Sequence, residues 1–102
     1  MGIGITSTQN SNTPSIVTSA GTALVANPAR IGWAIQNVGT NPLFVLLGSG
    51  ATSSVFHFVI KGGTGDSDGL GGSLSFFDGT IYDGIITVAG TSPKFVVLEV
   101  AP

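Results

Sequence analysis

One four-residue turn occurs twice in the chain, and each copy leads into a strand-like segment. Gly39-Thr40-Asn41-Pro42 precedes Leu43-Phe44-Val45, and Gly90-Thr91-Ser92-Pro93 precedes Lys94-Phe95-Val96, 51 residues later. Gly, Asn and Ser favour tight turns, and Pro, which has no N–H for a ladder, belongs at the first residue of a strand. Apolar segments precede both turns, so each is expected to close a hairpin. The repeat indicates two related β units within one domain, or the same turn chemistry reached independently.

Short apolar segments separated by turn residues continue through the rest of the chain. They cover residues 16–18, 22–25, 31–38, 43–47, 55–60, 73–77, 81–82, 85–88 and 95–100. None shows a sustained helical period. The sequence therefore predicts an all-β fold, a single antiparallel β-sandwich or jelly-roll-like barrel of about eight short strands over residues 15–102. Residues 1–14 are polar around Ile3 and Ile5, which predicts an extended N-terminal arm that either frays or docks on a partner.

The chain carries few charges for its length. Only eight of its 102 residues are Asp, Glu, Lys or Arg, and the net charge is −2, whereas soluble domains average about a quarter charged. Three scattered basic residues argue against nucleic-acid binding. No apolar run reaches the roughly 20 residues of a membrane span, and the amino terminus lacks a signal-peptide pattern, so the protein is expected to be made and used in the cytoplasm. So little charge favours a protein whose apolar faces are covered in an assembly.

Two predicted strands are apolar on both faces. In the segment Leu43–Leu47, Phe44 and Leu46 lie on one face and the other apolar side chains lie on the other face. In the segment 55–60, Phe56 and Phe58 share a face. Such strands are either central in a core or covered by another subunit. Arg30 opens a strand and is expected to pair with a carboxylate of a neighbouring subunit. The residues expected to contact a subunit or a capsid are Ile3, Ile5, Arg30, Phe44, Leu46, Phe56 and Phe58.

The side chains that carry chemistry form no recognisable catalytic motif. His57 is the only histidine and is expected to be structural, and no Gly-x-Ser-x-Gly elbow occurs. Asp66 and Asp68 lie in the glycine-rich segment 61–72 and suggest a calcium loop, but the spacing of an EF-hand is absent, so a flexible solvated loop is favoured. No cysteine is present for a disulfide or a thiolate ligand. We expect a protein without catalytic activity, metal or cofactor.

A carbohydrate-binding module is an alternative function. Trp33 and Tyr82 are the only Trp and Tyr of the chain, and together they would offer a stacking platform for a sugar ring. This hypothesis requires at least one of the two rings to be exposed. A single Trp on the apolar face of a strand is more often part of the core.

The segment Thr22-Ala23-Leu24-Val25-Ala26-Asn27-Pro28-Ala29-Arg30, followed by Trp33-Ala34-Ile35-Gln36-Asn37-Val38-Gly39-Thr40-Asn41-Pro42, resembles small structural proteins of tailed bacteriophages. The glycine-rich Asp loop, Tyr82-Asp83-Gly84-Ile85-Ile86 and the second Pro turn extend the resemblance over residues 16 to 100. It implies a non-enzymatic virion protein, most simply a capsid decoration or cement protein that binds the major capsid protein as an oligomer, with a trimer favoured. A small neck, tail or receptor-binding component is the alternative.

Overall fold

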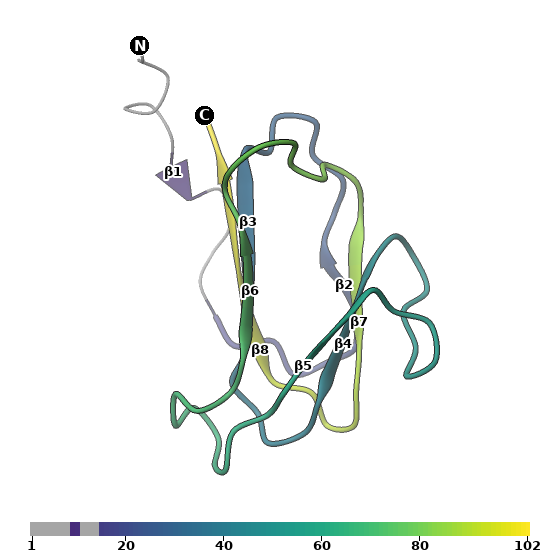
Figure 1. Ribbon diagram of the computed structural model, residues 1–102, viewed down its shortest axis with the longest axis vertical. Coiled ribbons are helices and arrows are strands. Elements are labelled where there is room, and N and C mark those ends of the chain that lie inside the picture. The colour runs from purple at the N-terminus through teal and green to yellow at the C-terminus, as the bar shows by residue number, and fades with distance from the viewer. Residues whose placement is uncertain (1–8, 11–14) are drawn as a thin grey trace.

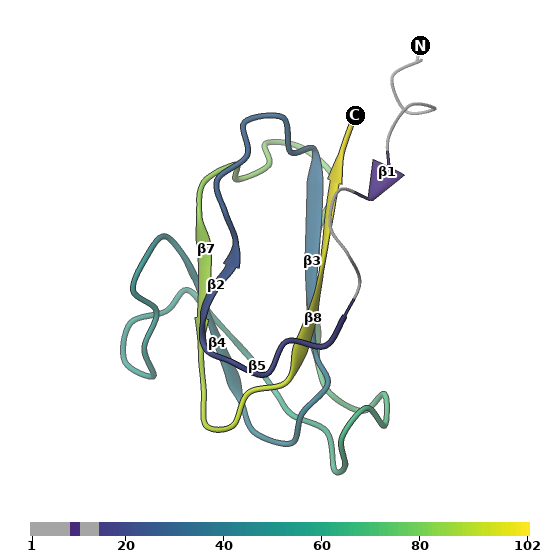
Figure 2. The ribbon, with the colours of Figure 1, turned by 180° about the vertical axis from the view of Figure 1, so that it is seen from behind.

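The computed structural model describes residues 9–10 and 15–102, and these form strands and loops (Figure 1). The strands are β1 (Gln9–Asn10), β2 (Gly21–Leu24), β3 (Gly32–Asn37), β4 (Leu43–Leu47), β5 (Phe58–Ile60), β6 (Ser73–Phe76), β7 (Ile86–Ala89) and β8 (Phe95–Ala101). They build a first sheet in the order β1-β8-β3-β6 and a second in the order β2-β7-β4-β5, with antiparallel pairing throughout. The two sheets face each other, as in a β-sandwich (Figures 1 and 2). The all-β prediction is confirmed.

The described residues contain no helix, and hence no helix that could cross a membrane. Of the arm expected over residues 1–14, only Gln9–Asn10 is described, and it pairs with Val100 and Ala101 of β8. Residues 1–8 and 11–14, among them Ile3 and Ile5, lie outside the described residues.

The hydrophobic core lies between the sheets and is made by alternate residues of the strands. In β3, Trp33 and Ile35 are buried whereas Ala34 and Gln36 point outward, which is the alternation that the sequence predicts. The buried core residues are Leu24, Trp33, Ile35, Leu43, Val45, Ile60, Ile86, Val88 and Phe95. Val45 pairs with Val88 on adjacent strands of the second sheet, and Ile35 pairs with Val97 in the first. Apolar side chains from both sheets therefore meet in the middle.

The prediction that the two Pro turns close hairpins is wrong. Residues 38–42 lead from β3 in the first sheet to β4 in the second, and residues 90–94 lead from β7 in the second sheet back to β8 in the first. Facing sheets lie about 10 Å apart, whereas paired strands lie about 4.8 Å apart. A five-residue connection spans that larger gap, and the same Gly, Asn and Pro turn chemistry serves either geometry. Both turns therefore join sheets.

The two matched turns lie against each other at one end of the molecule. The Asn41 side-chain amide donates a hydrogen bond to the Thr91 carbonyl oxygen at 2.9 Å. A Cβ placed on Gly90 would lie 2.9 Å from the Pro42 carbonyl oxygen, so glycine permits the close approach. Because β3 pairs with β8 and β4 pairs with β7, the repeat builds two stacked crossovers of one sandwich.

The glycine-rich loop 61–72 is tied to the first crossover, in contrast to the flexible loop that the sequence suggests. The Gly63 and Ser67 N–H groups donate to the Gly39 and Val38 carbonyl oxygens at 2.8 and 2.7 Å. A Cβ on Gly71 would lie only 2.2 Å from the Asn37 carbonyl oxygen. Small residues therefore let the loop backbone reach the turn and bond to it.

The predicted strands 55–60 and 81–82 also differ from the structure. The first is shortened to β5, because Thr52 and Val55 form their own small turn beforehand. Residues 81–82 lie in the connection between β6 and β7, where Ile81 and Tyr82 pack against the core without joining a sheet.

Candidate protein interface

An apolar patch covers part of the outer face of the second sheet, and it is formed by Phe44, Leu46, Phe56 and Val59. Phe44 and Leu46 are the outward residues of β4, between Leu43, Val45 and Leu47, and Phe44 lies opposite Val59 of β5. The Phe44 and Phe56 rings are in contact, with centroids 4.9 Å apart. Phe56 is 39% exposed and Val59 is 54% exposed. Phe44 and Leu46 are half-buried, and none of the four side chains is part of the core between the sheets.

The loop between β4 and β5 is hydrogen-bonded to β7 and β4 of the second sheet, and these bonds position Phe56. Thr87 points outward from β7, yet it is 5% exposed because the loop covers it. Its hydroxyl donates to the Gly48 carbonyl oxygen at 2.7 Å and accepts from the Ala51 N–H at 3.1 Å. His57 holds the other end of the loop. Its ring Nδ1 accepts a hydrogen bond from the Leu47 N–H at 3.0 Å, and its backbone N–H donates to the Val45 carbonyl oxygen at 2.8 Å. His57 is therefore hydrogen-bonded, as expected from the sequence, but it lies in the loop before β5 and not within a strand.

The chain has only eight charged residues, and several of them are engaged in contacts within the chain. Arg30 and Glu99 are buried, and Lys94 forms an ion pair with Asp66. Asp68 accepts hydrogen bonds from its own loop. The other charged residues are Lys61, Asp78 and Asp83. Interface cores are depleted in charge and enriched in aromatic side chains. Phe44 and Phe56 give the patch the aromatic content that is typical of interface cores.

No protein-family model, curated protein or solved structure was found to match the chain. The chemistry of its surfaces is therefore the basis for a functional hypothesis.

Three of the expected contact residues, Phe44, Leu46 and Phe56, lie on the patch. Phe58 does not. It faces inward, packs against the core and contacts the Phe76 ring at 5.9 Å. The sequence predicts Phe56 and Phe58 on one face, but β5 begins at Phe58, so strand alternation does not extend back to Phe56. Val59 is not among the predicted contact residues, but alternation within β5 places it beside Phe44.

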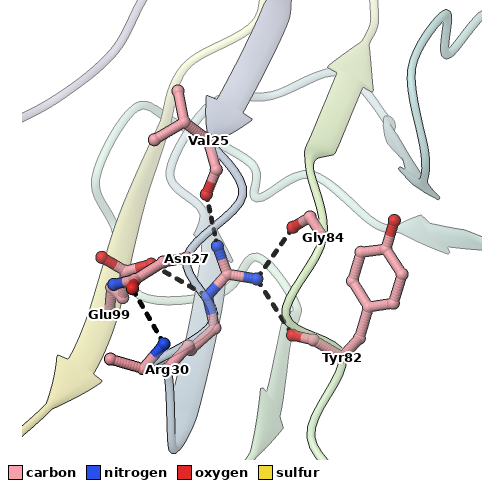
Figure 3. Close-up of polar contacts among 7 residues, drawn as sticks. Val25, Asn27, Arg30, Tyr82, Gly84 and Glu99 are labelled. Carbon is pink, nitrogen blue, oxygen red and sulfur yellow. Dashed lines mark hydrogen bonds and ion pairs between the residues drawn. The ribbon is translucent and has the colours of Figure 1, made fainter.

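Arg30 is not on the surface, which corrects the expectation of a contact with another subunit. Its side chain has no exposed area, and its Nε donates to Glu99 Oε2 of the same chain at 2.8 Å (Figure 3). The remaining guanidinium nitrogens donate to carbonyl oxygens of Val25, Tyr82 and Gly84, at 2.6 to 2.9 Å. Arg30 therefore holds the connections before β3 and before β7 against β8.

Trp33 and Tyr82 do not form a stacking platform. Trp33 is 1% exposed and lies against Phe76, with ring centroids 4.9 Å apart. Tyr82 is partly buried against the core, and its hydroxyl lies 2.5 Å from where a Cβ on Gly84 would be. A buried indole presents no face to a sugar ring, so the geometry does not favour carbohydrate binding at this pair.

The carboxylates of the glycine-rich loop are used within the loop and its neighbours. One Asp68 oxygen accepts from the Thr64 N–H and hydroxyl and from the Gly65 N–H at 2.7 to 3.0 Å, and the other accepts from the Leu70 N–H at 2.9 Å. Asp66 pairs with Lys94. Within residues 9–10 and 15–102, no three Asp, Glu or His side chains gather as a metal site would require. This arrangement explains the two aspartates as loop-ordering groups.

The hydrogen bonds to Asp68 make the loop sensitive to acid. Those from Leu70 and Thr64 lower the pKa of Asp68 below its ordinary 3.8. A folded-state pKa below the unfolded value contributes stability that is complete above pH 3.8 and is lost as pH falls through the lower folded pKa. We expect Asp68→Asn to be less stable than the wild type at pH 7 and to lose less stability on acidification.

Urea unfolding at several pH values measures this difference, with Asp78→Asn as the control because Asp78 lies in another exposed turn. Parallel acid profiles for the wild type and Asp68→Asn would contradict the role assigned to Asp68.

Proposed function

We propose that this protein is a non-enzymatic structural component of a tailed-bacteriophage virion. In this proposal it binds the head surface as an oligomer, a trimer being favoured, and stabilises contacts between subunits of the major capsid protein. It would be made in the cytoplasm of the host bacterium and act in the virion. The apolar patch carries the proposal, since exposed aromatic and aliphatic side chains on a charge-poor surface are typical of a buried protein contact. The sequence resemblance supports the choice of a virion.

We further propose that the fold is a jelly roll of eight strands. The pairs β1 with β8, β2 with β7, β3 with β6 and β4 with β5 are those of one long antiparallel ribbon folded over on itself. Along the chain, every connection except that from β4 to β5 passes from one sheet to the other. Jelly rolls are common in capsid proteins, so this strand order is compatible with the proposed role.

A binding experiment with patch variants tests the proposed contact. Phe56→Ser and Val59→Ser remove exposed apolar side chains that are not part of the core, so folding should be preserved. We expect each to weaken binding to phage heads that lack this protein by about tenfold or more, the effect of losing one central interface side chain. Co-sedimentation of the protein with the heads at increasing concentration measures the affinity.

Leu70→Ser is the matched control, because Leu70 is 56% exposed but lies in the glycine-rich loop 61–72, outside the patch. Equal binding by the patch variants and the control would exclude the patch as the contact. Failure of the wild type to bind heads would reject the head-surface role. Electron microscopy of the particle then separates the two locations, because density at the neck or tail would favour the alternative virion component.

A further inference from the structure

Three aspartates of the chain are followed directly by glycine, at Asp68-Gly69, Asp78-Gly79 and Asp83-Gly84. In such a pair the backbone nitrogen of the glycine can attack the side-chain carboxyl carbon of the aspartate. A C–N bond forms, a carboxyl C–O bond breaks and a water molecule leaves, which gives a cyclic succinimide. Water then opens the ring, and opening at the main-chain carbonyl joins the chain through the side-chain carbon as isoaspartate. The two steps together isomerise the aspartate without a change of mass and need no other reactant.

The fold decides which of the three pairs reacts, because ring closure requires two movements. The carboxyl group must leave its hydrogen-bond partners, and the peptide group between the two residues must rotate. Glycine favours the attack, since it has no Cβ beside its nitrogen. Where hydrogen bonds hold either group, the segment must first open locally, and this opening costs free energy. An exposed pair without such bonds should therefore react first.

Asp68 is held away from this reaction by its own loop. Its two carboxylate oxygens accept hydrogen bonds from Thr64, Gly65 and Leu70 at 2.7 to 3.0 Å. The bonds from Leu70 and Thr64 also lower the pKa of Asp68 below its ordinary 3.8, so less of the carboxyl group is protonated. The protonated form is the reactive one, because it loses its oxygen as water. Several hydrogen bonds must therefore break before this pair can react.

The peptide group between Asp83 and Gly84 is held on both sides. The Asp83 carbonyl oxygen accepts from the Asn27 N–H at 2.8 Å. The next carbonyl oxygen, that of Gly84, accepts from the Arg30 guanidinium at 2.9 Å (Figure 3). A Cβ placed on Gly84 would lie 2.5 Å from the Tyr82 hydroxyl, so this side chain covers the glycine. Rotation of the peptide group would break these hydrogen bonds and displace Tyr82.

Asp78 and Gly79 have neither kind of restraint. Both are exposed, in the connection from β6 to β7 at one end of the sandwich (Figure 1). Within residues 9–10 and 15–102, no hydrogen bond or ion pair joins either of them to another residue. A Cβ placed on Gly79 would meet no atom within 4 Å, so no neighbouring element obstructs the ring. We infer that Asp78 is a site of spontaneous isoaspartate formation in the folded protein.

The modification is independent of the proposed virion role, and its structural effect is local. Isoaspartate lengthens the main chain by one carbon atom and places the carboxylate on Cα. On one side of the site the Phe77 ring lies over Gly32, and on the other side Ile81 packs against the core. The added carbon atom therefore falls in an exposed bend between two anchored residues. We expect the modified chain to keep its fold.

Peptide mapping of the aged wild-type protein tests the inference. The folded protein is kept at mildly acidic pH and 37 °C for several weeks and is then digested with trypsin. Cleavage after Lys61 and Lys94 releases residues 62–94, which contain all three pairs. Electron-transfer fragmentation in a mass spectrometer distinguishes isoaspartate from aspartate at each position. We expect at least tenfold more isoaspartate at Asp78 than at Asp68 or Asp83.

A second sample is aged in guanidinium chloride, which removes the hydrogen bonds of the fold. There the three pairs should react at similar rates. Asp78→Glu is the matched variant, because it keeps an exposed carboxylate but would need a larger ring. An isoaspartyl methyltransferase, which transfers a methyl group from S-adenosylmethionine to isoaspartate, measures the total in each folded protein. We expect Asp78→Glu to contain at least fivefold less isoaspartate than the wild type.

Three results would overturn the inference. The first is an absence of isoaspartate at Asp78 in the folded protein, or an equal amount at Asp68 or Asp83. The second is the same preference for Asp78 in guanidinium chloride, since the selectivity would then come from the neighbouring sequence and not from the fold. The third is equal methylation of the folded wild type and Asp78→Glu.

Discussion

Replacing Arg30 by methionine is expected to lower the free energy of unfolding by about 3–5 kcal/mol, the usual cost of removing one partner of a buried ion pair. The Arg30 side chain is fully buried, and that of Glu99 is 10% exposed. The change leaves Glu99 without its guanidinium partner. It also removes the donor to the carbonyl oxygens of Val25, Tyr82 and Gly84. The loss is a large part of the roughly 5–15 kcal/mol that holds a domain together.

Urea unfolding of four proteins measures this effect: the wild type, Arg30→Met, Glu99→Leu and the double variant. Because a buried charge is costly alone, the double variant should be less destabilised than the sum of the single variants, by about 1 kcal/mol or more. Recovery should be incomplete, since the three carbonyl groups still lack their donor. Lys94→Met is the control, because its ion pair with Asp66 is exposed and is worth less than about 1 kcal/mol. An Arg30→Met protein no less stable than Lys94→Met would contradict the role of this cluster.

Strand alternation in β8 predicts that one basic residue is buried beside Glu99. Phe95, Val97, Glu99 and Ala101 share one face of β8, and that face is inward because Phe95 is in the core. A carboxylate on an inward face requires a cationic partner, and only three basic residues exist. The sequence alone does not say which of the three is the partner, because Arg30 and Glu99 meet only after β3 and β8 pair.

The same physics explains which other features were predictable. Period-two alternation gave the inward side of β3 and the outward positions of Phe44 and Leu46, because these depend on neighbouring residues alone. The sequence does not say whether the two Pro turns connect neighbouring strands or facing sheets, because a five-residue connection reaches either an adjacent strand or the facing sheet. The inward position of Phe58 also depended on where β5 begins, which the turn formed by Thr52 and Val55 decides.

Replacing Asn37 by alanine is expected to lower the free energy of unfolding by roughly 3 kcal/mol, because buried groups lose a side-chain hydrogen-bond partner. Asn37 is 2% exposed at the end of β3. Its amide donates to the carbonyl oxygens of Asn41 and Ile60 at 2.8 and 3.0 Å, and its oxygen accepts from the Gly39 N–H at 2.9 Å. One side chain thereby fastens the first crossover to the end of β5. Asn37→Asp should also be destabilised, since a carboxylate cannot donate to the two carbonyl groups.

Asn41→Ala is the control for this position, since Asn41 is exposed and its side chain makes one described hydrogen bond, to Thr91. That change should cost less than about 1 kcal/mol. Amide hydrogen exchange gives a second readout, because the Gly63 and Ser67 N–H groups bond to the same crossover and should exchange faster in Asn37→Ala. If Asn37→Ala were as stable as Asn41→Ala, with unchanged exchange in loop 61–72, the crossover would be held by its backbone contacts alone. The greater loss expected for Asn37 follows from its burial, which denies the abandoned carbonyl and N–H groups a replacement partner in water.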